Sequence, residues 1–540
     1  MADSDFPAGR AGPARAGSAG AAGDRAASDV RAQMGAEIAD AVRAPLLLVL
    51  FLVALVLPVA IEVAGMRLTP IRIFLLVTFV PVALKVISGG AGRVRLADAV
   101  FVVFGAWMML TIIRAEGMSR LPYSAILAVE IMGGYFLGRL LIRSPADWKR
   151  FIVLHFIVLL VLAPFVAVEL FTGRQIWAEL LDPIGEVQWR PRSSRPRMGL
   201  ERVLTGFDHP ILYGLFCSLG AAATFYIWRD RFFYAVARVG FMTGMTFASL
   251  SSGPLLSVMI QAMLVGWDMV TRGAWKTIVA IVATIWIFLT VASNRGPVII
   301  FIETMTFSAN NAWTRVNQWR YGWENVMDHK LYGIGLLPWE GPTWLGQSID
   351  AFWLAIAIRH GLVGMLLIFA ALVLVLWGTL RRRDLDPLVA RYRTGWMIGF
   401  TGLFFTLTTV HVWDAISVVV MFYVGAGVWY ADWAGRDAAT AGTAAGTDGG
   451  TDGGTDEGPA DGGGRMAPRT SARTQTGPRT PPRPDRQTAP RTEATPEAAP
   501  DPAADRAPAG GSRYARDLRP RHTRERTTRP RPGTPPRRER

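Results

Sequence analysis

The chain has 540 residues, of which 51% are hydrophobic and 18% are charged, and its formal net charge is +15. So much apolar sequence, with the charge confined to a few stretches, excludes most soluble enzymes and favours a polytopic membrane protein. The single cysteine, Cys217, excludes a disulfide framework and a thiolate metal cluster, and we expect it to be a small buried hydrophobe.

The N-terminal segment, residues 1–43, is rich in Ala, Gly, Arg and Asp and contains no apolar core of a signal peptide. Such a composition cannot bury enough apolar surface to fold by itself. We therefore expect a disordered cytoplasmic arm. The first membrane helix, which begins near Pro45, would then direct the chain to the membrane.

The central region, residues 44–432, contains apolar runs that are long enough to cross a bilayer. We therefore predict an all-α, polytopic transmembrane helical bundle of about twelve helices. The runs cover residues 44–64, 70–88, 96–113, 121–142, 150–171, 210–228, 232–250, 253–271, 275–293, 352–380, 395–411 and 414–431. The long run at 352–380 is expected to begin as a short helix and to turn between Gly361 and Gly364.

The orientation of the bundle follows from its short loops. With the N-terminus inside, the cytoplasmic loops contain Lys85, Arg93, Arg95, Arg139, Arg143, Lys149, Arg150, Arg229, Arg231, Arg272, Lys276, Arg381, Arg382, Arg383, Arg391 and Arg393, and the short outer loops contain far fewer cations. This agrees with the positive-inside rule. Both termini are therefore predicted to be cytoplasmic.

Two longer loops, residues 172–208 and 294–349, face outward in this topology and are nevertheless rich in cations. They contain Arg174, Arg190, Arg192, Arg195, Arg197 and Arg202, and Arg295, Arg315, Arg320 and Lys330. Long loops are exempt from the topological charge bias, so one interpretation is an ordinary solvated surface. The other is an anion site on the outer face, because guanidinium groups stay charged and bind phosphate in bidentate geometry.

The second outer loop contains the segment NAWTRVNQWRYGWENVMDH, which has helical period and follows the candidate N-caps Ser308 and Asn310. One stripe is apolar and aromatic, and a neighbouring stripe is polar. The first contains Val316, Trp319, Trp323 and Val326, and the second contains Arg315, Gln318, Asn325 and His329. This pattern predicts a helix at the membrane surface, which either holds a lipid-linked substrate or is a plug without chemistry.

The C-terminal segment, residues 433–540, begins with a Gly/Thr/Asp repeat and continues as an Arg/Pro-rich tract. We expect a disordered cytoplasmic tail that contacts anionic lipid headgroups or a partner protein. The tract lacks interleaved aromatic residues, so a folded nucleic-acid module and a nucleic-acid partner are not expected.

The order of several motifs is similar to that of the O-antigen ligase and polymerase superfamily of bacterial envelope polysaccharide assembly. The motifs are ELFTGRQIW at 169–177, GFDHPILYG at 206–214, LSSGPLL at 250–256, RVNQWRYGWENVMDHKLYGIG at 315–335 and SIDAFWLAIAIRHGLVGMLL at 348–367. This resemblance covers roughly residues 44–432. It implies an enzyme of the bacterial inner membrane that works with other polysaccharide assembly proteins.

The resemblance also implies a reaction. A glycan passes from undecaprenyl pyrophosphate to a hydroxyl of a glycan or lipid-linked acceptor at the outer face, without a metal, a cofactor or a nucleotide sugar. The leaving pyrophosphate gains negative charge, which fixed Arg donors can stabilise. Our candidates are Arg315 first, and then Arg295, Arg320 and Arg202.

Asp350 occupies the family's position for a His-Asn or Asp-Asn pair and is our candidate base for the acceptor hydroxyl. Its alternative role, shared with Ser348, is to cap the helix that follows. His209 either orients substrate or caps the helix that begins at Pro210. His329 is either a second base or a solvated residue.

Trp319 is expected to bind substrate as part of the aromatic stripe. His411 and Asp414 flank a short outer turn and could reach the same cavity.

Three functions are weighed against one another. Ligases that act on lipid A core sugars generally have His at the position of Asp350, so the Asp favours polymerisation of O-antigen or exopolysaccharide repeat units. The first alternative is a ligase that attaches the glycan to lipid A core or another acceptor. The second is a transporter or flippase of lipid-linked saccharide, which would place charged residues deep within its helices.

Overall fold

The computed structural model describes Ser28 and residues 31–63, 65–184, 186–187, 196–305 and 309–433. These residues lie in one compact unit, and a second unit, Gly453–Arg540, falls outside the described ranges. The predictions for residues 1–27 and for the tail after Trp433 also lie outside them, as do Arg190, Arg192, Arg195 and Ser308.

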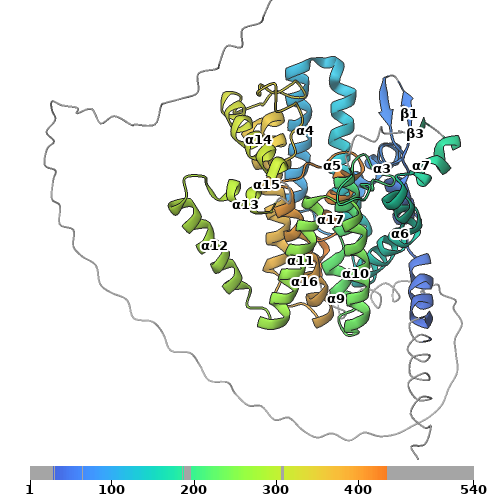
Figure 1. Ribbon diagram of the computed structural model, residues 1–540. Coiled ribbons are helices and arrows are strands. Elements are labelled where there is room, and N and C mark those ends of the chain that lie inside the picture. Colours follow the sequence, from blue (N-terminus) through green and yellow to red (C-terminus); the bar gives the residue numbers. More distant parts are fainter. Residues whose placement is uncertain are drawn as a thin grey trace, which may run out of the picture. The chain divides into compact units, whose positions relative to one another are not determined.

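The described unit is mostly helical and is built as a membrane-spanning bundle (Figure 1). Within the described ranges, nine helical segments are long and apolar enough to cross a membrane, or ten if one bent pair is counted. They are α3 (Pro70–Ile87), α4 (Leu96–Glu116), η1 with α5 (Met118–Leu141), α6 (Pro145–Thr172), α8 with α9 (Pro210–Ile227), α11 (Ser252–Thr271), α12 (Trp275–Ala292), α15 (Phe352–Arg381) and α17 with α18 (Ala415–Asp432).

The predicted number of about twelve helices is therefore not confirmed. Two of the remaining runs do form helices, α10 (Phe232–Ala248) and α16 (Pro387–Thr406). The first is a shorter apolar helix of 17 residues. The second includes Arg391 and Arg393, which make its first turns polar.

The prediction of a single helix over residues 44–64 is wrong. Helix α2 (Leu46–Val56) ends ahead of Pro58, and the chain then forms the strands β1 (Val59–Val63) and β2 (Met66–Leu68). Proline cannot donate a helical hydrogen bond, and the β-branched residues that follow favour a strand. Strand β1 also pairs with β3 (Glu186–Val187), which gives a small antiparallel sheet in the order β2-β1-β3.

Part of the expected disordered N-terminal arm is also ordered. Residues Arg31–Val42 form a helix that meets α2 at an angle of 102°. Its Glu37 is buried, forms an ion pair with Arg238 of α10, and accepts a hydrogen bond of 2.6 Å from the indole nitrogen of Trp228. A buried charge requires such partners, so this contact positions the helix against the bundle.

The centre of the bundle is held by close backbone contact between α5 and α17 (Ala415–Gly425). A Cβ atom at Gly138 would lie 2.1 Å from the carbonyl oxygen of Phe422, and one at Gly425 would lie 2.0 Å from that of Tyr135. Small residues let membrane helices approach closely. The hydrophobic effect does not drive helices together within lipid, so van der Waals packing stabilises their association instead.

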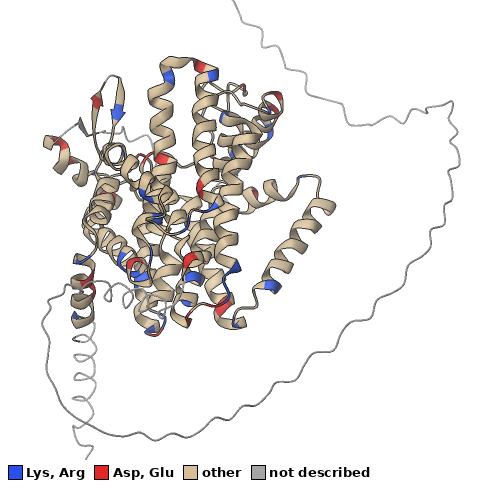
Figure 2. Cartoon of the chain, turned by 180° about the vertical axis from the view of Figure 1, so that it is seen from behind, with Lys and Arg blue, Asp and Glu red and all other residues tan. Residues whose placement is uncertain are grey.

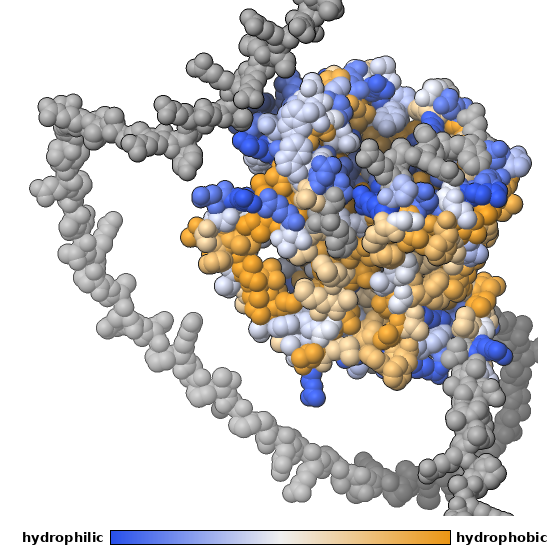
Figure 3. Space-filling view, viewed as in Figure 1, coloured by the Kyte–Doolittle hydropathy of each residue, from blue (hydrophilic) through white to orange (hydrophobic). Residues whose placement is uncertain are grey.

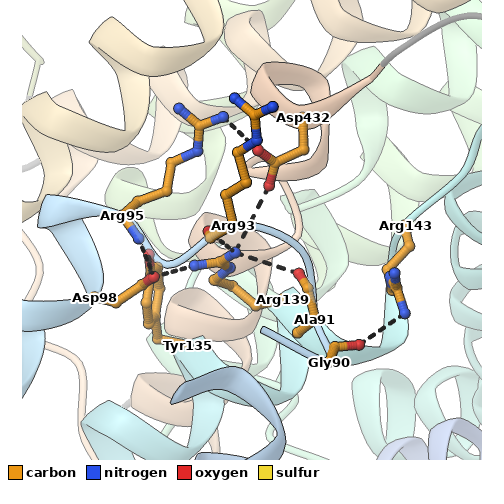
Figure 4. Close-up of polar contacts among 9 residues, drawn as sticks. All are labelled: Gly90, Ala91, Arg93, Arg95, Asp98, Tyr135, Arg139, Arg143 and Asp432. Atoms are coloured by element: carbon orange, nitrogen blue, oxygen red, sulfur yellow. Dashed lines mark hydrogen bonds and ion pairs between the residues drawn. The ribbon is translucent and has the colours of Figure 1, made fainter. Parts of the chain in front are cut away.

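An ion network connects the ends of α4, α5 and α18 (Trp429–Asp432) at the predicted cytoplasmic side (Figure 4). The buried Arg139 pairs with Asp98, and it donates a hydrogen bond of 2.9 Å to the carbonyl oxygen of Arg93. Asp432 pairs with Arg95. Several cations that fit the positive-inside rule therefore also hold helix ends together.

Helix α12 lies apart from the bundle in Figure 1, and none of its residues is buried. A helix that is apolar all round and unburied is suited to contact lipid. Figure 3 shows apolar residues gathered in a broad band, with hydrophilic patches above it, and Figure 2 shows long stretches of the helices without charged residues. Both distributions fit a protein that spans a membrane.

Candidate functional site

The second predicted outer loop forms the helices α13 (Pro297–Met305) and α14 (Ala309–Asp328), and α14 packs on the first part of α15. Close packing occurs at Gly322, where a Cβ atom would lie 3.0 Å from a methyl group of Leu354 and 3.1 Å from one of Ile358. The absence of a side chain at Gly322 therefore lets α14 lie directly over α15.

Helix α14 has the two predicted stripes, and each is buried in part: Val326 of the apolar stripe is fully buried, and His329 of the polar stripe is exposed. Arg315, Gln318 and Asn325 are buried, whereas 41% of Trp323 is exposed. Burial of a polar stripe costs free energy unless its groups find partners. The three buried polar residues of α14 therefore require partners within the bundle.

Gln318 connects α14 to the segment before α15. Its amide nitrogen donates a hydrogen bond of 2.8 Å to the carbonyl oxygen of Ser348, and its amide oxygen accepts one of 3.1 Å from the backbone N–H of Asp350. The sequence stripe contained Gln318, but we did not predict it as a site residue. Its two bonds fix the backbone that carries the candidate base.

The alternative role of Asp350 and Ser348 as helix caps is wrong. Helix α15 begins at Phe352, and its N-cap is Ala351, without a capping side chain. Instead, Oδ2 of Asp350 lies 3.8 Å from Nε of Arg315, and 39% of the Asp350 side chain remains exposed. The structure therefore pairs our two candidate catalytic residues and leaves the carboxylate accessible.

Three guanidinium groups gather on one turn, Ser249–Ser252, between α10 and α11. Arg197 donates a hydrogen bond of 2.6 Å to the carbonyl oxygen of Leu250, and Arg202 donates one of 2.7 Å to Oγ of Ser251. Arg315 reaches the same turn, with Nη1 3.5 Å from Oγ of Ser252. We call Arg197, Arg202 and Arg315 the arginine cluster.

The electrostatics of the arginine cluster follow from burial and from its like charges. Burial, with a smaller contribution from the Arg197 cation, lowers the pKa of Arg202 to about 10. Burial also lowers the pKa of Arg315, against the attraction of Asp350. Arg202 stays positive at neutral pH, because a pKa of about 10 keeps its proton bound, and an arginine guanidinium such as that of Arg315 keeps its proton in proteins. The cluster is therefore suited to bind an anion with more than one negative charge.

Asp350 has the opposite shift. Its partial burial raises the pKa of its carboxyl, while Arg315 and the hydrogen bond with Gln318 act to lower it. A carboxylate with a raised pKa accepts a proton more readily, so the residue is better suited to act as a general base than an ordinary surface aspartate.

Several predicted site residues are not brought to the arginine cluster. Arg295 is exposed and forms an ion pair of 3.1 Å with Glu303. Arg320 lies on the exposed side of α14, 5.8 Å from the ring centroid of Tyr321. His329 is exposed at the end of α14, which agrees with the alternative prediction that it is a solvated residue. These positions leave them outside the site.

Trp319 and His209 make structural contacts. Trp319 is half-buried, and its indole nitrogen donates to the carbonyl oxygen of Thr408 at 3.4 Å. His209 is the N-cap of α8 (Pro210–Ser218), with Nδ1 accepting from the backbone N–H of Ile211 at 3.1 Å, which confirms its capping role. The His209 ring also lies 6.2 Å from that of Trp413.

A second polar cluster lies among α3, α5 and the start of α17. Nε of Arg72 lies 2.6 Å from a carboxylate oxygen of Glu130 and 3.5 Å from one of Asp414. The sequence analysis singled out Asp414 but predicted neither Arg72 nor Glu130 as its partner. The available signal was Glu130, an ionisable residue inside a predicted span, which usually has a functional or structural partner.

Comparison with known proteins adds no family. No protein-family model matches the chain, and no curated protein matches it either. The similarity to the O-antigen ligase and polymerase superfamily therefore stays a prediction from the motifs.

Proposed function

We propose that the chain is a membrane glycosyltransferase that moves a glycan from undecaprenyl pyrophosphate to an acceptor hydroxyl at the outer face of the bacterial inner membrane, and that it polymerises O-antigen or exopolysaccharide repeat units. The observation that carries this proposal is the arginine cluster beside Asp350. The cluster provides positive charge for a pyrophosphate, and Asp350 provides an accessible carboxylate next to it.

The site can be assigned to the steps of such a transfer. The bond between the anomeric carbon and the pyrophosphate oxygen breaks, and the arginine cluster stabilises the charge that develops on the leaving group. The acceptor oxygen bonds to the anomeric carbon, and its proton passes to the Asp350 carboxylate. Gln318 acts on the backbone of Asp350 and positions the base.

The length of α15 supports an outer location for the site. The helix begins beside Asp350 and ends at Arg381, where a run of three arginines starts. The part after Gly361 alone rises about 30 Å, which is the thickness of the apolar layer of a bilayer. If the arginine run is cytoplasmic, as the positive-inside rule predicts, then Asp350 faces the outer side.

The test is the chain length of the surface polysaccharide in cells that lack the protein. With wild-type complementation we expect a polymer ladder on a gel, and with Arg315→Ala we expect single repeat units. Arg320→Ala is the matched control, because that side chain is exposed on the same helix. A full ladder with Arg315→Ala, at normal protein level, would remove the cluster from the mechanism.

The same gel separates the two alternative functions. A ligase would leave polymer length unchanged, and the finished polymer would fail to reach its acceptor. A flippase is favoured by one observation, the Arg72–Glu130 pair within spanning helices. Its loss would leave the lipid-linked repeat unit in the inner leaflet, inaccessible to a membrane-impermeant glycan label.

A further inference from the structure

Two adjoining cavities lie beside the strands β1 and β2, and neither is lined by a residue of the turn that holds the arginine cluster. Both are lined by Pro58, Arg67, Gly206, Phe207 and Asp208. We call the two cavities together the hairpin groove.

Each half of the hairpin groove combines an indole ring with oxygen acceptors. The first is lined by Trp413, of which 37% is exposed, and by the carboxylates of Asp208 and Asp414. The second is lined by Trp177 and Gln175. A saccharide offers C–H faces that pack on an aromatic ring and hydroxyl groups that donate to carboxylates and amides, so this chemistry fits a sugar.

The charge of the groove separates it from the arginine cluster. Among the lining residues that the structure describes, one is cationic: Arg67, which lies 3.7 Å from the carboxylate of Asp208, while Asp414 and Glu169 add further acidic groups. Glu169 is engaged by Thr205 and by the backbone N–H of Leu204. An acidic groove repels pyrophosphate and favours an uncharged or amino sugar.

The carboxylate of Asp414 is held in place before any ligand binds. Its backbone has φ of 50° and ψ of −135°, a conformation that costs free energy for a residue with a side chain. Arg72 and the hydroxyl of Thr69, at 3.5 and 3.3 Å, fix the side chain. A fixed acceptor costs less entropy when it binds a hydroxyl group.

Two chain segments connect the hairpin groove to the arginine cluster. The first contains Arg202 of the cluster and Asp208 of the groove. The second is the turn before α17, where the ring of His411 lies 6.2 Å from that of Phe352 and 5.9 Å from that of Trp413. Phe352 is two residues from Asp350, so this turn connects the neighbourhood of Asp350 with Trp413 of the groove.

We infer that the hairpin groove is the acceptor site, which binds the uncharged, hydroxyl-rich end of a growing glycan by packing on Trp413 and hydrogen bonding to Asp208 and Asp414. This inference rests on the proposed function, because only a transferase needs an acceptor next to its leaving-group site. The pyrophosphate of the donor and the sugar of the acceptor would then occupy sites of opposite charge.

The test uses purified full-length protein in nanodiscs and oligosaccharides released by mild acid from the polysaccharide of the producing cells. Binding is measured by titration without donor. We expect Trp413→Ala to bind about tenfold more weakly or worse, as loss of one aromatic contact of about 1.4 kcal/mol would give. Trp413→Phe should retain most of the affinity. Trp344→Ala is the control, because its ring is more exposed and lies outside the groove.

A second measurement keeps this inference separate from the proposed function. With lipid-linked donor, we expect Trp413→Ala to raise the KM for the acceptor and to leave the KM for the donor unchanged, while Arg315→Ala still binds the oligosaccharides but transfers nothing. If the wild-type protein binds the oligosaccharides but transfers no glycan, the proposed function is wrong. The hairpin groove would then still be a saccharide-binding site. If transfer is normal and the KM for the acceptor is equal in wild type and Trp413→Ala, the hairpin groove is not the acceptor site, and the proposed function is unaffected.

Discussion

At the residue scale, the candidate site depends on the guanidinium of Arg315, in the second predicted outer loop, and on the carboxylate of Asp350, which directly follows that loop. Arg315 is 5% exposed and cannot lose its charge, whereas Asp350 keeps contact with solvent. A lysine at position 315 would keep the charge but not the planar fork that binds two phosphate oxygens at once. The identity of the residue therefore matters as much as its sign.

The pH dependence of transfer should report on Asp350. The base must be ionised to accept the proton of the acceptor, and partial burial raises its pKa above the usual aspartate range. We therefore expect the rate to fall as the pH decreases through this raised pKa, and Asp350→Asn to be inactive at every pH. The measurement is the initial rate of transfer across the acidic range. A flat acidic limb in the wild type would exclude Asp350 as the base.

At the element scale, the turn after α14 and the break in α15 form one unit. Gly361 has φ of 69° and ψ of −179° within α15. These non-helical angles agree with the turn that was predicted between Gly361 and Gly364. The backbone N–H of Leu362 donates a hydrogen bond of 2.7 Å to the carbonyl oxygen of Lys330, and that of Gly335 donates one of 2.9 Å to Arg359. The glycine-containing turn thus satisfies backbone groups that the helix break frees.

Gly361→Ala should disrupt this unit. A Cβ atom there would lie 2.2 Å from the carbonyl oxygen of Leu331, and the positive φ adds strain of about 1–3 kcal/mol. We expect a lower midpoint of thermal unfolding in detergent, together with loss of transfer because α14 is displaced. Gly244→Ala, where a Cβ atom meets nothing within 4 Å, is the control and should be neutral or slightly stabilising. Equal unfolding midpoints for both variants would contradict the close packing of Gly361 against the turn after α14.

At the scale of the whole molecule, the proposed function requires the arginine cluster to face away from the cytoplasm. The chain has one cysteine, and Cys217 is buried, so single new cysteines can be labelled against a low background. We expect a membrane-impermeant maleimide to label Trp344→Cys in spheroplasts and to label Arg383→Cys only after the membrane is opened. The reverse pattern would place Arg315 in the cytosol and end the proposal.

The sequence by itself determined that this is a helical membrane protein and where most of its helices lie. A helix that crosses lipid must be apolar over its length and must satisfy its own backbone, so each run carries its own signal. The runs at 70–88, 96–113 and 275–293 correspond to α3, α4 and α12 within a few residues. The two cation-rich loops were also visible, because charge is a local property of the chain.

Only the tertiary structure decided which charges meet. Arg202 and Arg315 converge with Arg197 on the turn Ser249–Ser252, whereas Arg295 and Arg320 face outward, and all five belong to the same two loops. Convergence depends on contacts between residues far apart in the chain, which no local pattern encodes. The same holds for the strand after Pro58 and for the pair of Arg72 with Glu130, where long-range packing supplies the partner that each polar group requires.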